Sequence, residues 1–250
     1  MIKPEELTSN NVYDRCAATY GYEIDRIFSS RFKYNLVRKF VNRSDVILDV
    51  GCGNGIHMQV LAQHCRAVKG IDINEKMLAL AKQKLDEKQL ANTEVDLQSA
   101  SELKFSDDAF DLVYSFSTLL LVPDIFGAIG ELARVLREGG IAILDITGKY
   151  NLSQLHWRRF YRKQGHFGLH AFSHGTMVNV LASFGLRIEE QHALGFTDQW
   201  KYLPGGRLLG FAERLFHGNE DDDLDYRISN WPLFFPLANR WYVVCRKESI

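Results

Sequence analysis

Short apolar runs alternate with longer amphipathic stretches through the middle of the chain. Five of these runs have the length of buried strands and are bounded by turn-forming residues, at positions 46–50, 67–71, 93–97, 110–115 and 141–146. Three stretches between them carry apolar residues every three or four positions, which predicts helices at 56–63, 74–85 and 125–136. Strands that alternate with helices of this length form right-handed crossovers and a parallel sheet. The pattern therefore predicts a doubly wound α/β fold with helices on both faces of the sheet.

The two ends of the chain follow this pattern less regularly. Residues 10–43 have helical spacing, with a second helix expected around residues 32–40. Near the C-terminus, a helix at 175–184 precedes two further strands, predicted at 186–194 and 241–245, which bring the mostly parallel sheet to seven strands. The two adjacent glycines at 139–140 are expected to end the helix before the fifth strand as a C-cap.

Aromatic residues gather in the stretches 156–175 and 199–236, which glycine and proline interrupt. Irregular insertions after the fifth strand of such a fold tend to cover the ligand crevice at the carboxyl ends of the strands. An aromatic cover suits an apolar or ring-bearing ligand, although the same residues could build a small core of their own. Residues 207–217 are amphipathic and could close a pocket or rest on a membrane surface.

The composition narrows the functional class. Lys and Arg number 30 and Asp and Glu 31, so the chain lacks the basic excess of a nucleic-acid-binding protein. The four cysteines have no metal-binding spacing, which indicates reduced thiols in a cytoplasmic protein and no metal site. The first residues do not form a secretory signal. The longest stretch without charged residues, 164–186, carries too many polar residues for a transmembrane segment. The oligomeric state stays open.

The loop after the first predicted strand is the most informative motif. Residues 49–55 read DVGCGNG and lead directly into a predicted helix. Glycines let the backbone turn sharply and let a ligand approach closer than a Cβ atom would permit. A helix N-terminus favours negatively charged groups. Asp72 ends the second strand, where a carboxylate can accept both hydroxyls of a ribose.

With this loop, residues 44–146 resemble the core of the class I S-adenosylmethionine-dependent methyltransferases, in their small-molecule branch. Four later segments agree with that family in order and spacing: 70–74 (GIDIN), 97–105, 110–115 and 131–140. The resemblance implies S-adenosylmethionine as cofactor and S-adenosylhomocysteine as product. It also implies a single methyltransferase domain over residues 1–250, made of an N-terminal helical lid (1–43), a cofactor-binding core (44–149), and substrate-covering insertions with the closing strands (150–250).

The resemblance further implies roles for individual residues. Asp49 would orient the methionyl ammonium, and the carbonyl group near Phe116 would receive it. Asp72 would hold the ribose hydroxyls. The complete set expected at the cofactor is Tyr20, Asp49, Gly51, Gly53, Asn54, Gly55, Asp72, Ile73, Ser99, Ala100 and Phe116.

The adenine side includes the main departures from the family. Ile73 would flank the adenine, and Ser99 and Ala100 would face its edge, although most relatives have Asp where Ser99 stands. A frequent pair of histidines after the fourth strand is replaced by leucines at 120–121, and the usual proline before Gly139 is Glu138. These departures leave the cofactor site in place but weaken any analogy about the substrate.

Three residues are candidates for a catalytic role, each with a structural alternative. Tyr20, in the predicted lid, could place its ring near the sulfonium or could pack the lid on the core. His170 could act as a general base if the acceptor must lose a proton, or could be a surface histidine. Asp145, near the end of the fifth strand, faces the crevice by topology but could equally be a structural carboxylate.

The sequence thus predicts an enzyme that transfers a methyl group to an O, N or C nucleophile of a small, partly apolar or aromatic molecule. One alternative is methylation of a lipid or quinone-type acceptor at a membrane surface. A second alternative is a catalytically inactive methyltransferase-like protein that binds the cofactor or a partner.

Overall fold

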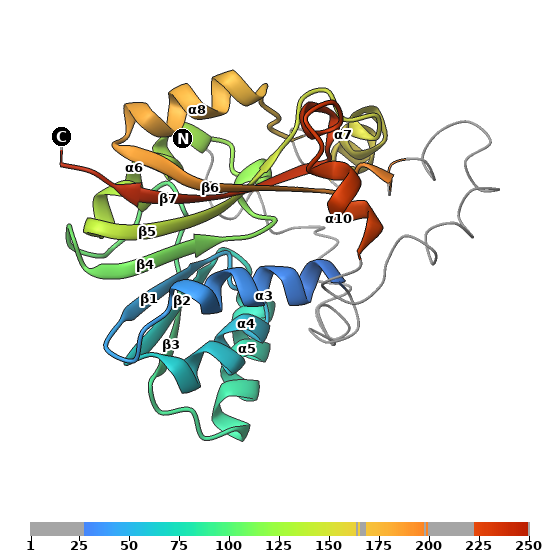
Figure 1. Ribbon diagram of the computed structural model, residues 1–250. Coiled ribbons are helices and arrows are strands. Elements are labelled where there is room, and N and C mark those ends of the chain that lie inside the picture. The colour runs from blue at the N-terminus through green and yellow to red at the C-terminus, as the bar shows by residue number, and fades with distance from the viewer. Residues whose placement is uncertain (1–27, 164, 166–168, 198, 200–222, 250) are drawn as a thin grey trace.

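Seven strands form a single sheet in the order β3-β2-β1-β4-β5-β7-β6 (Figure 1). The computed structural model describes residues 28–163, 165, 169–197, 199 and 223–249. The strands are β1 (Val46–Val50), β2 (Ala67–Asp72), β3 (Thr93–Leu97), β4 (Phe110–Ser115), β5 (Leu136–Thr147), β6 (Leu186–Leu194) and β7 (Arg240–Lys247). The first five pair in parallel, whereas β7 is antiparallel to both β5 and β6. The predicted doubly wound, mostly parallel sheet is confirmed.

Helices cover both faces of this sheet (Figure 1). One face carries α3 (Phe28–Phe40), α4 (Ile56–Leu61) and α5 (Glu75–Glu87), and the other carries α6 (Ile125–Val135) and α8 (His174–Ser183). Two further helices, α7 (Gln154–Lys163) and α10 (Leu224–Ser229), lie at the end of the sheet where β5 ends and β7 begins. Short 3-10 turns occur at Ala62–His64, Leu119–Leu121 (η2) and Phe235–Leu237.

The first strand shows why the sheet is buried on both sides. Leu48 and Val50 pack with the residues of α6 and α8, whereas Ile47 packs with those of α3 and α4. Successive side chains of a strand point to opposite faces, so a run with no polar alternation requires a helix layer on each side. The two layers therefore follow from the uniform apolar character of the strand.

The junction between α6 and β5 differs from the sequence prediction. The helix ends at Val135, and Leu136 is already extended and pairs with Phe110 of β4. The two glycines at 139–140 lie inside β5, where the register shifts before Ile141 pairs with β4, so they do not cap the helix. Leu136 is fully buried, and its pairing with the sheet ends the helix before Gly139 is reached.

The stretches expected to be irregular contain helices that the sequence analysis did not predict. α7 lies within the aromatic stretch that follows β5, and α10 lies in the second such stretch. α7 forms because it contains good helix formers such as Gln, Leu, Arg and Lys. The glycines that follow it made a helix in this stretch harder to predict from the sequence. The helix expected at 32–40 is present and begins earlier, at Phe28. The first N-terminal helix and residues 207–217 lie outside the described residues.

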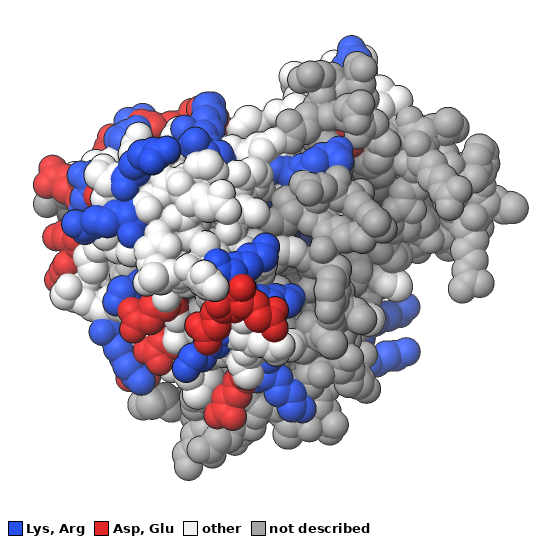
Figure 2. All heavy atoms as spheres, turned by 90° about the horizontal axis from the view of Figure 1, so that it is seen from below, with Lys and Arg blue, Asp and Glu red and all other residues white. Residues whose placement is uncertain are grey.

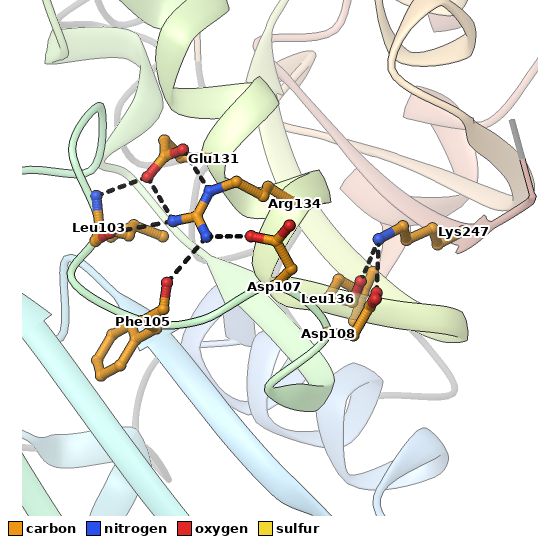
Figure 3. A network of polar contacts seen from close by, with 8 residues as sticks. All are labelled: Leu103, Phe105, Asp107, Asp108, Glu131, Arg134, Leu136 and Lys247. Atoms are coloured by element: carbon orange, nitrogen blue, oxygen red, sulfur yellow. Dashed lines mark hydrogen bonds and ion pairs between the residues drawn. The ribbon is translucent and has the colours of Figure 1, made fainter.

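One arginine connects α6 to the loop between β3 and β4 (Figure 3). Arg134 donates two hydrogen bonds to Glu131, at 2.7 and 2.8 Å, and further ones to the backbone carbonyls of Leu103 and Phe105. Glu131 in turn accepts the Leu103 N–H at 2.7 Å, and this hydrogen-bonded arginine holds the pKa of Glu131 below its ordinary value. The loop is therefore attached to the helix mainly through its backbone, at the Leu103 N–H and the carbonyls of Leu103 and Phe105, and also through the side chain of Asp107.

We expect Arg134→Met to destabilise the protein by about 2–3 kcal/mol, because two carbonyls and a carboxylate lose a charged donor. Urea unfolding followed by circular dichroism measures this loss. Asp107→Asn is the control: it removes an ion pair to the same guanidinium, but the Asp107 side chain is 73% exposed, so the loss should stay under about 1 kcal/mol. Equal losses in the two variants would contradict the assignment.

Candidate functional site

A pocket opens at the carboxyl ends of β1 to β4. Gly51 and Gly53 follow β1, residues 72–74 end and follow β2, residues 98–100 follow β3, and residues 116–118 follow β4; all of them line the pocket. Parallel strands send their following loops to the same edge of the sheet, so four loops far apart in the sequence meet here. The space between them is about 890 Å³ including its open mouth, a size typical of small-molecule sites.

The glycine loop after β1 has a left-handed backbone at three positions. Gly51, Gly53 and Gly55 have φ angles of 80°, 53° and 72°, which residues with a side chain rarely adopt. A Cβ atom on Gly51 would lie 1.9 Å from the hydroxyl oxygen of Thr118, so a larger residue does not fit. A Cβ atom on Gly53 would meet nothing within 4 Å and would take up space at the pocket wall.

Among the described residues that line the pocket, Asp72 is the acidic one. Its Oδ2 accepts the Gly53 N–H and its Oδ1 accepts the Asn74 N–H, both at 2.9 Å. Burial raises the pKa of Asp72, whereas these backbone hydrogen bonds lower it. Each carboxylate oxygen can accept more than one hydrogen bond. Asp72 is thus held rigidly in the wall with acceptor capacity left for two hydroxyl groups of a ligand.

Asp49 lies near the pocket but does not line it. Asp49 is 4% exposed. Its Oδ2 accepts a hydrogen bond from the Tyr114 hydroxyl at 2.7 Å. The pKa of Asp49 is raised to about 7, chiefly by burial, with the Tyr114 hydrogen bond lowering it and the charge of Asp72 raising it. Asn54 and Gly55, also expected at the cofactor, are likewise not found among the described wall residues.

The residues expected on the adenine side are brought together by the fold. Ile73, Ser99 and Ala100 line the same pocket although they come from the ends of different strands, and Phe116 lines it as well. The Ser99 hydroxyl lies 3.0 Å from that of Ser101 and accepts its backbone N–H at 3.3 Å. Tyr20 lies outside the described residues, so its expected place at the cofactor stays a prediction.

Several wall residues had no recognisable signal in the sequence. Ser117 has a φ angle of 58°, its N–H donates to Asp145 Oδ1 at 2.8 Å, and its hydroxyl accepts from Lys33 Nζ at 3.2 Å. These partners come from α3 and β5, so no local pattern could indicate them. The other wall residues that were not expected are Ile71, Asn74, Met77, Gln98, Thr118, Leu121, Val122 and Pro123.

The two described catalytic candidates support the loop after β4. Asp145 is 1% exposed, accepts the Ser117 N–H, and lies with its Oδ2 3.4 Å from Arg240 Nη1. His170 Nε2 lies 3.2 Å from the carbonyl oxygen of Pro123. Neither residue belongs to the pocket wall, so their contacts position that loop, and a catalytic role for either stays a prediction.

The described residues contain no group of three or more His, Cys, Asp or Glu side chains placed to hold a metal ion. In the same part of the chain, no helix combines the length and apolar character needed to cross a membrane.

Comparison with known proteins agrees with this geometry. Residues 48–144 match the family model described as a methyltransferase domain. A demethylmenaquinone methyltransferase of Listeria welshimeri is 35% identical over 156 residues, which is 59% of this chain and 66% of that protein. A phosphatidylethanolamine N-methyltransferase of Cereibacter sphaeroides is 37% identical over 103 residues, covering 41% of this chain and 50% of that protein. The alignments to the first four relatives span between 42% and 66% of their length.

A solved structure has the same fold at low sequence identity. It is the Haemonchus contortus phosphoethanolamine N-methyltransferase 2, in complex with phosphomonomethylethanolamine and S-adenosylhomocysteine. The TM-score is 0.62 at 18% identity, and the alignment covers 88% of this chain and 53% of that one. The sheet order is that of a Rossmann-like methyltransferase fold. Residues 48–144 carry the matched methyltransferase domain, in agreement with the resemblance to the class I methyltransferases.

The buried Asp49 should make stability depend on pH. Its pKa is raised from 3.8 to about 7, so its contribution is fully present below the unfolded pKa and is lost as pH rises through about 7. The full change corresponds to about 4 kcal/mol. We expect wild type to lose stability relative to Asp49→Asn between pH 4 and pH 8, as measured by urea unfolding at each pH. A constant difference between the two proteins would contradict the buried, protonated state.

Proposed function

We propose that the pocket binds S-adenosylmethionine and that the chain transfers its methyl group to an O, N or C atom of a small molecule. The observation that carries the proposal is the Asp72 carboxylate, fixed at the end of β2 by two backbone N–H groups and lining the pocket. Such a carboxylate can accept both hydroxyls of a ribose. When bound, S-adenosylmethionine supplies an electrophilic methyl group on a sulfonium.

The other pocket residues suit the remaining parts of this cofactor. Gly51 and Gly53 leave room beside the backbone, and Ile73 with Ala100 offers an apolar wall for a flat base. Asp49 lies buried behind the glycine loop, and an ammonium group bound beside the loop would favour its charged form over the protonated one. The Phe116 carbonyl is a second acceptor at the pocket wall. In this arrangement residues 44–149 hold the cofactor, and residues 150–250 cover the acceptor.

The acceptor cannot be carried over from the relatives, because their names describe different acceptors, a quinone precursor and an ethanolamine lipid. The charge pattern supports a small molecule. On the face shown in Figure 2, Lys and Arg lie beside Asp and Glu over the described residues, and no large patch of one sign forms there. A nucleic acid would require a basic stripe. Catalysis of an in-line displacement then depends mainly on holding the nucleophile aligned and close.

S-adenosylhomocysteine should raise the melting temperature of the full chain, and Gly53→Ala should abolish most of that shift. An alanine at Gly53 meets no atom of the described residues within 4 Å but takes up space at the pocket wall. Gly139→Ala is the matched control, because Gly139 also has a positive φ, of 70°, and open space around it, yet lies outside the pocket. Both variants should lose about 1 kcal/mol of stability, but only Gly53→Ala should lose binding.

The same measurement with Asp72→Ala tests the ribose contact, and its shift should also disappear. No shift with the intact protein would overturn the cofactor assignment. A clear shift without methyl transfer to any member of a broad acceptor panel would instead favour the inactive, cofactor-binding alternative.

A second candidate function, methylation of an acceptor at a membrane surface, is favoured by α7. This ten-residue helix contains four Lys and Arg residues and no acid, and none of its residues is buried. Leu155 is 60% exposed beside them. A basic helix with an exposed apolar side chain suits the interface of an anionic bilayer. In this version, α7 would bring the acceptor side of the protein to the lipid.

If this version holds, the protein should co-sediment with vesicles of phosphatidylglycerol and phosphatidylcholine. The double variant Arg158→Gln with Arg162→Gln should weaken this binding about thirtyfold. Each cation near an anionic surface contributes about 1 kcal/mol. Lys76→Gln with Lys82→Gln removes the same charge from exposed positions of α5 and serves as the control. Equal loss in both double variants would indicate a general charge effect, and no co-sedimentation at low salt would reject the membrane version.

A further inference from the structure

A second, smaller pocket lies beside the first at the carboxyl end of β5. Thr147 ends β5, Arg240 begins β7 as its cross-strand neighbour, and both line this pocket together with Trp157 and Tyr161 of α7. Leu120 contributes to its wall, whereas the adjacent Leu121 contributes to the first pocket. The two pockets therefore lie on either side of the η2 turn.

The second pocket contains a buried polar group that has no partner within the described part of the chain. Thr147 is 5% exposed, and its hydroxyl oxygen makes no hydrogen bond to any described residue. A buried hydroxyl without a partner is costly, and such groups in a native protein generally serve a ligand or a bound water. The amides of Asn151 and Gln154 line the same space. The pocket thus offers neutral polar groups around an aromatic wall.

One charged side chain lines this pocket among the described residues. It belongs to Arg240, and none of the other described lining residues is charged. Arg240 Nη1 lies 3.4 Å from Asp145 Oδ2, and the other oxygen of that carboxylate accepts the Ser117 N–H. Asp145 is not among the described lining residues, so the guanidinium presents the charge that a ligand in this pocket would meet.

We propose that the second pocket is the acceptor subsite and that it binds an oxyanion, a carboxylate or a phosphate, carried on an aromatic or apolar body. Arg240 pairs with the oxyanion, and the Thr147 hydroxyl donates to it. Trp157 and Tyr161 pack against the body of the acceptor. Guanidinium groups suit this task because their fork of N–H donors matches two oxygens of one anion. The inference rests on the proposed function, since it assigns the acceptor class of that same site.

The test uses the full chain saturated with S-adenosylhomocysteine, with benzoate, phenyl phosphate and benzamide as probes in calorimetric titration. We expect one of the two anions to bind about tenfold or more tightly than benzamide, a difference typical of a charge-assisted hydrogen bond. The stronger anion distinguishes a carboxylate from a phosphate subsite. Equal affinities for all three probes, or no binding of either anion, would overturn the inference.

Two variants separate the roles of the residues. Arg240→Gln should remove the preference for the anion, whereas Arg246→Gln, on the same strand and face but bonded to Glu189, should not. Thr147→Val should weaken anion binding about tenfold yet leave the ligand-free protein at least as stable, because its hydroxyl has no partner to lose. Thr93→Val should instead leave anion binding unchanged and destabilise the ligand-free protein, since the Thr93 hydroxyl donates to the Leu90 carbonyl at 2.7 Å.

The comparison of Thr147→Val with Thr93→Val tests the subsite even if Arg240→Gln fails to fold. Unchanged anion binding in Thr147→Val would overturn the subsite as described. Failure of S-adenosylhomocysteine to shift the melting temperature would instead reject the proposed function. The two failures are therefore distinguishable, because the first requires an intact cofactor response.

Discussion

The parallel pairing of β1 between β2 and β4 is the constraint on which the rest of the molecule depends. Ile47, Leu48 and Asp49 pair with both neighbours, with Val68, Lys69 and Gly70 on one side and Leu112, Val113 and Tyr114 on the other. The three strands consequently end at the same edge of the sheet. The glycine loop, the Asp72 turn and the Ser117 turn are thereby placed around one space. A slip of one residue in this register would turn the buried side chains of a strand to the opposite layer.

Buried carboxylates hold the loops at that edge. Asp72 accepts backbone N–H groups from two loops, Asp145 accepts the N–H of Ser117, and Asp49 accepts the Tyr114 hydroxyl. Burial alone disfavours each charge, and the hydrogen bonds offset part of that cost. The energetic consequence is a rigid rim, because moving any one loop would leave a buried carboxylate without its donor. A rigid rim suits a site that must align a ligand.

The second pocket is built differently. Its described walls come from η2, α7 and the ends of β5 and β7, and they include the Thr147 hydroxyl, which makes no hydrogen bond within the described part of the chain. In the first pocket, by contrast, the Asp72 carboxylate is fixed by two backbone N–H groups. In our proposal the first pocket takes the cofactor and the second selects the acceptor.

The sequence alone determined the order of elements and most of their bounds. The strands at 46–50, 93–97, 110–115 and 186–194 occur as predicted. The central strands 46–50 and 110–115 are buried almost throughout, so their largely apolar runs are visible locally. The edge strands 93–97 and 186–194 are only partly buried and carry more polar residues. Seven of the residues expected at the cofactor line the pocket, since they follow strands at fixed offsets. Only the tertiary structure decided that the sheet, rather than two glycines, ends α6, and that Lys33, Ser117, Asp145 and Arg240 meet. Those contacts join residues far apart in the chain, and no local pattern of hydrophobicity or turn chemistry carries information about which distant partner a side chain will find.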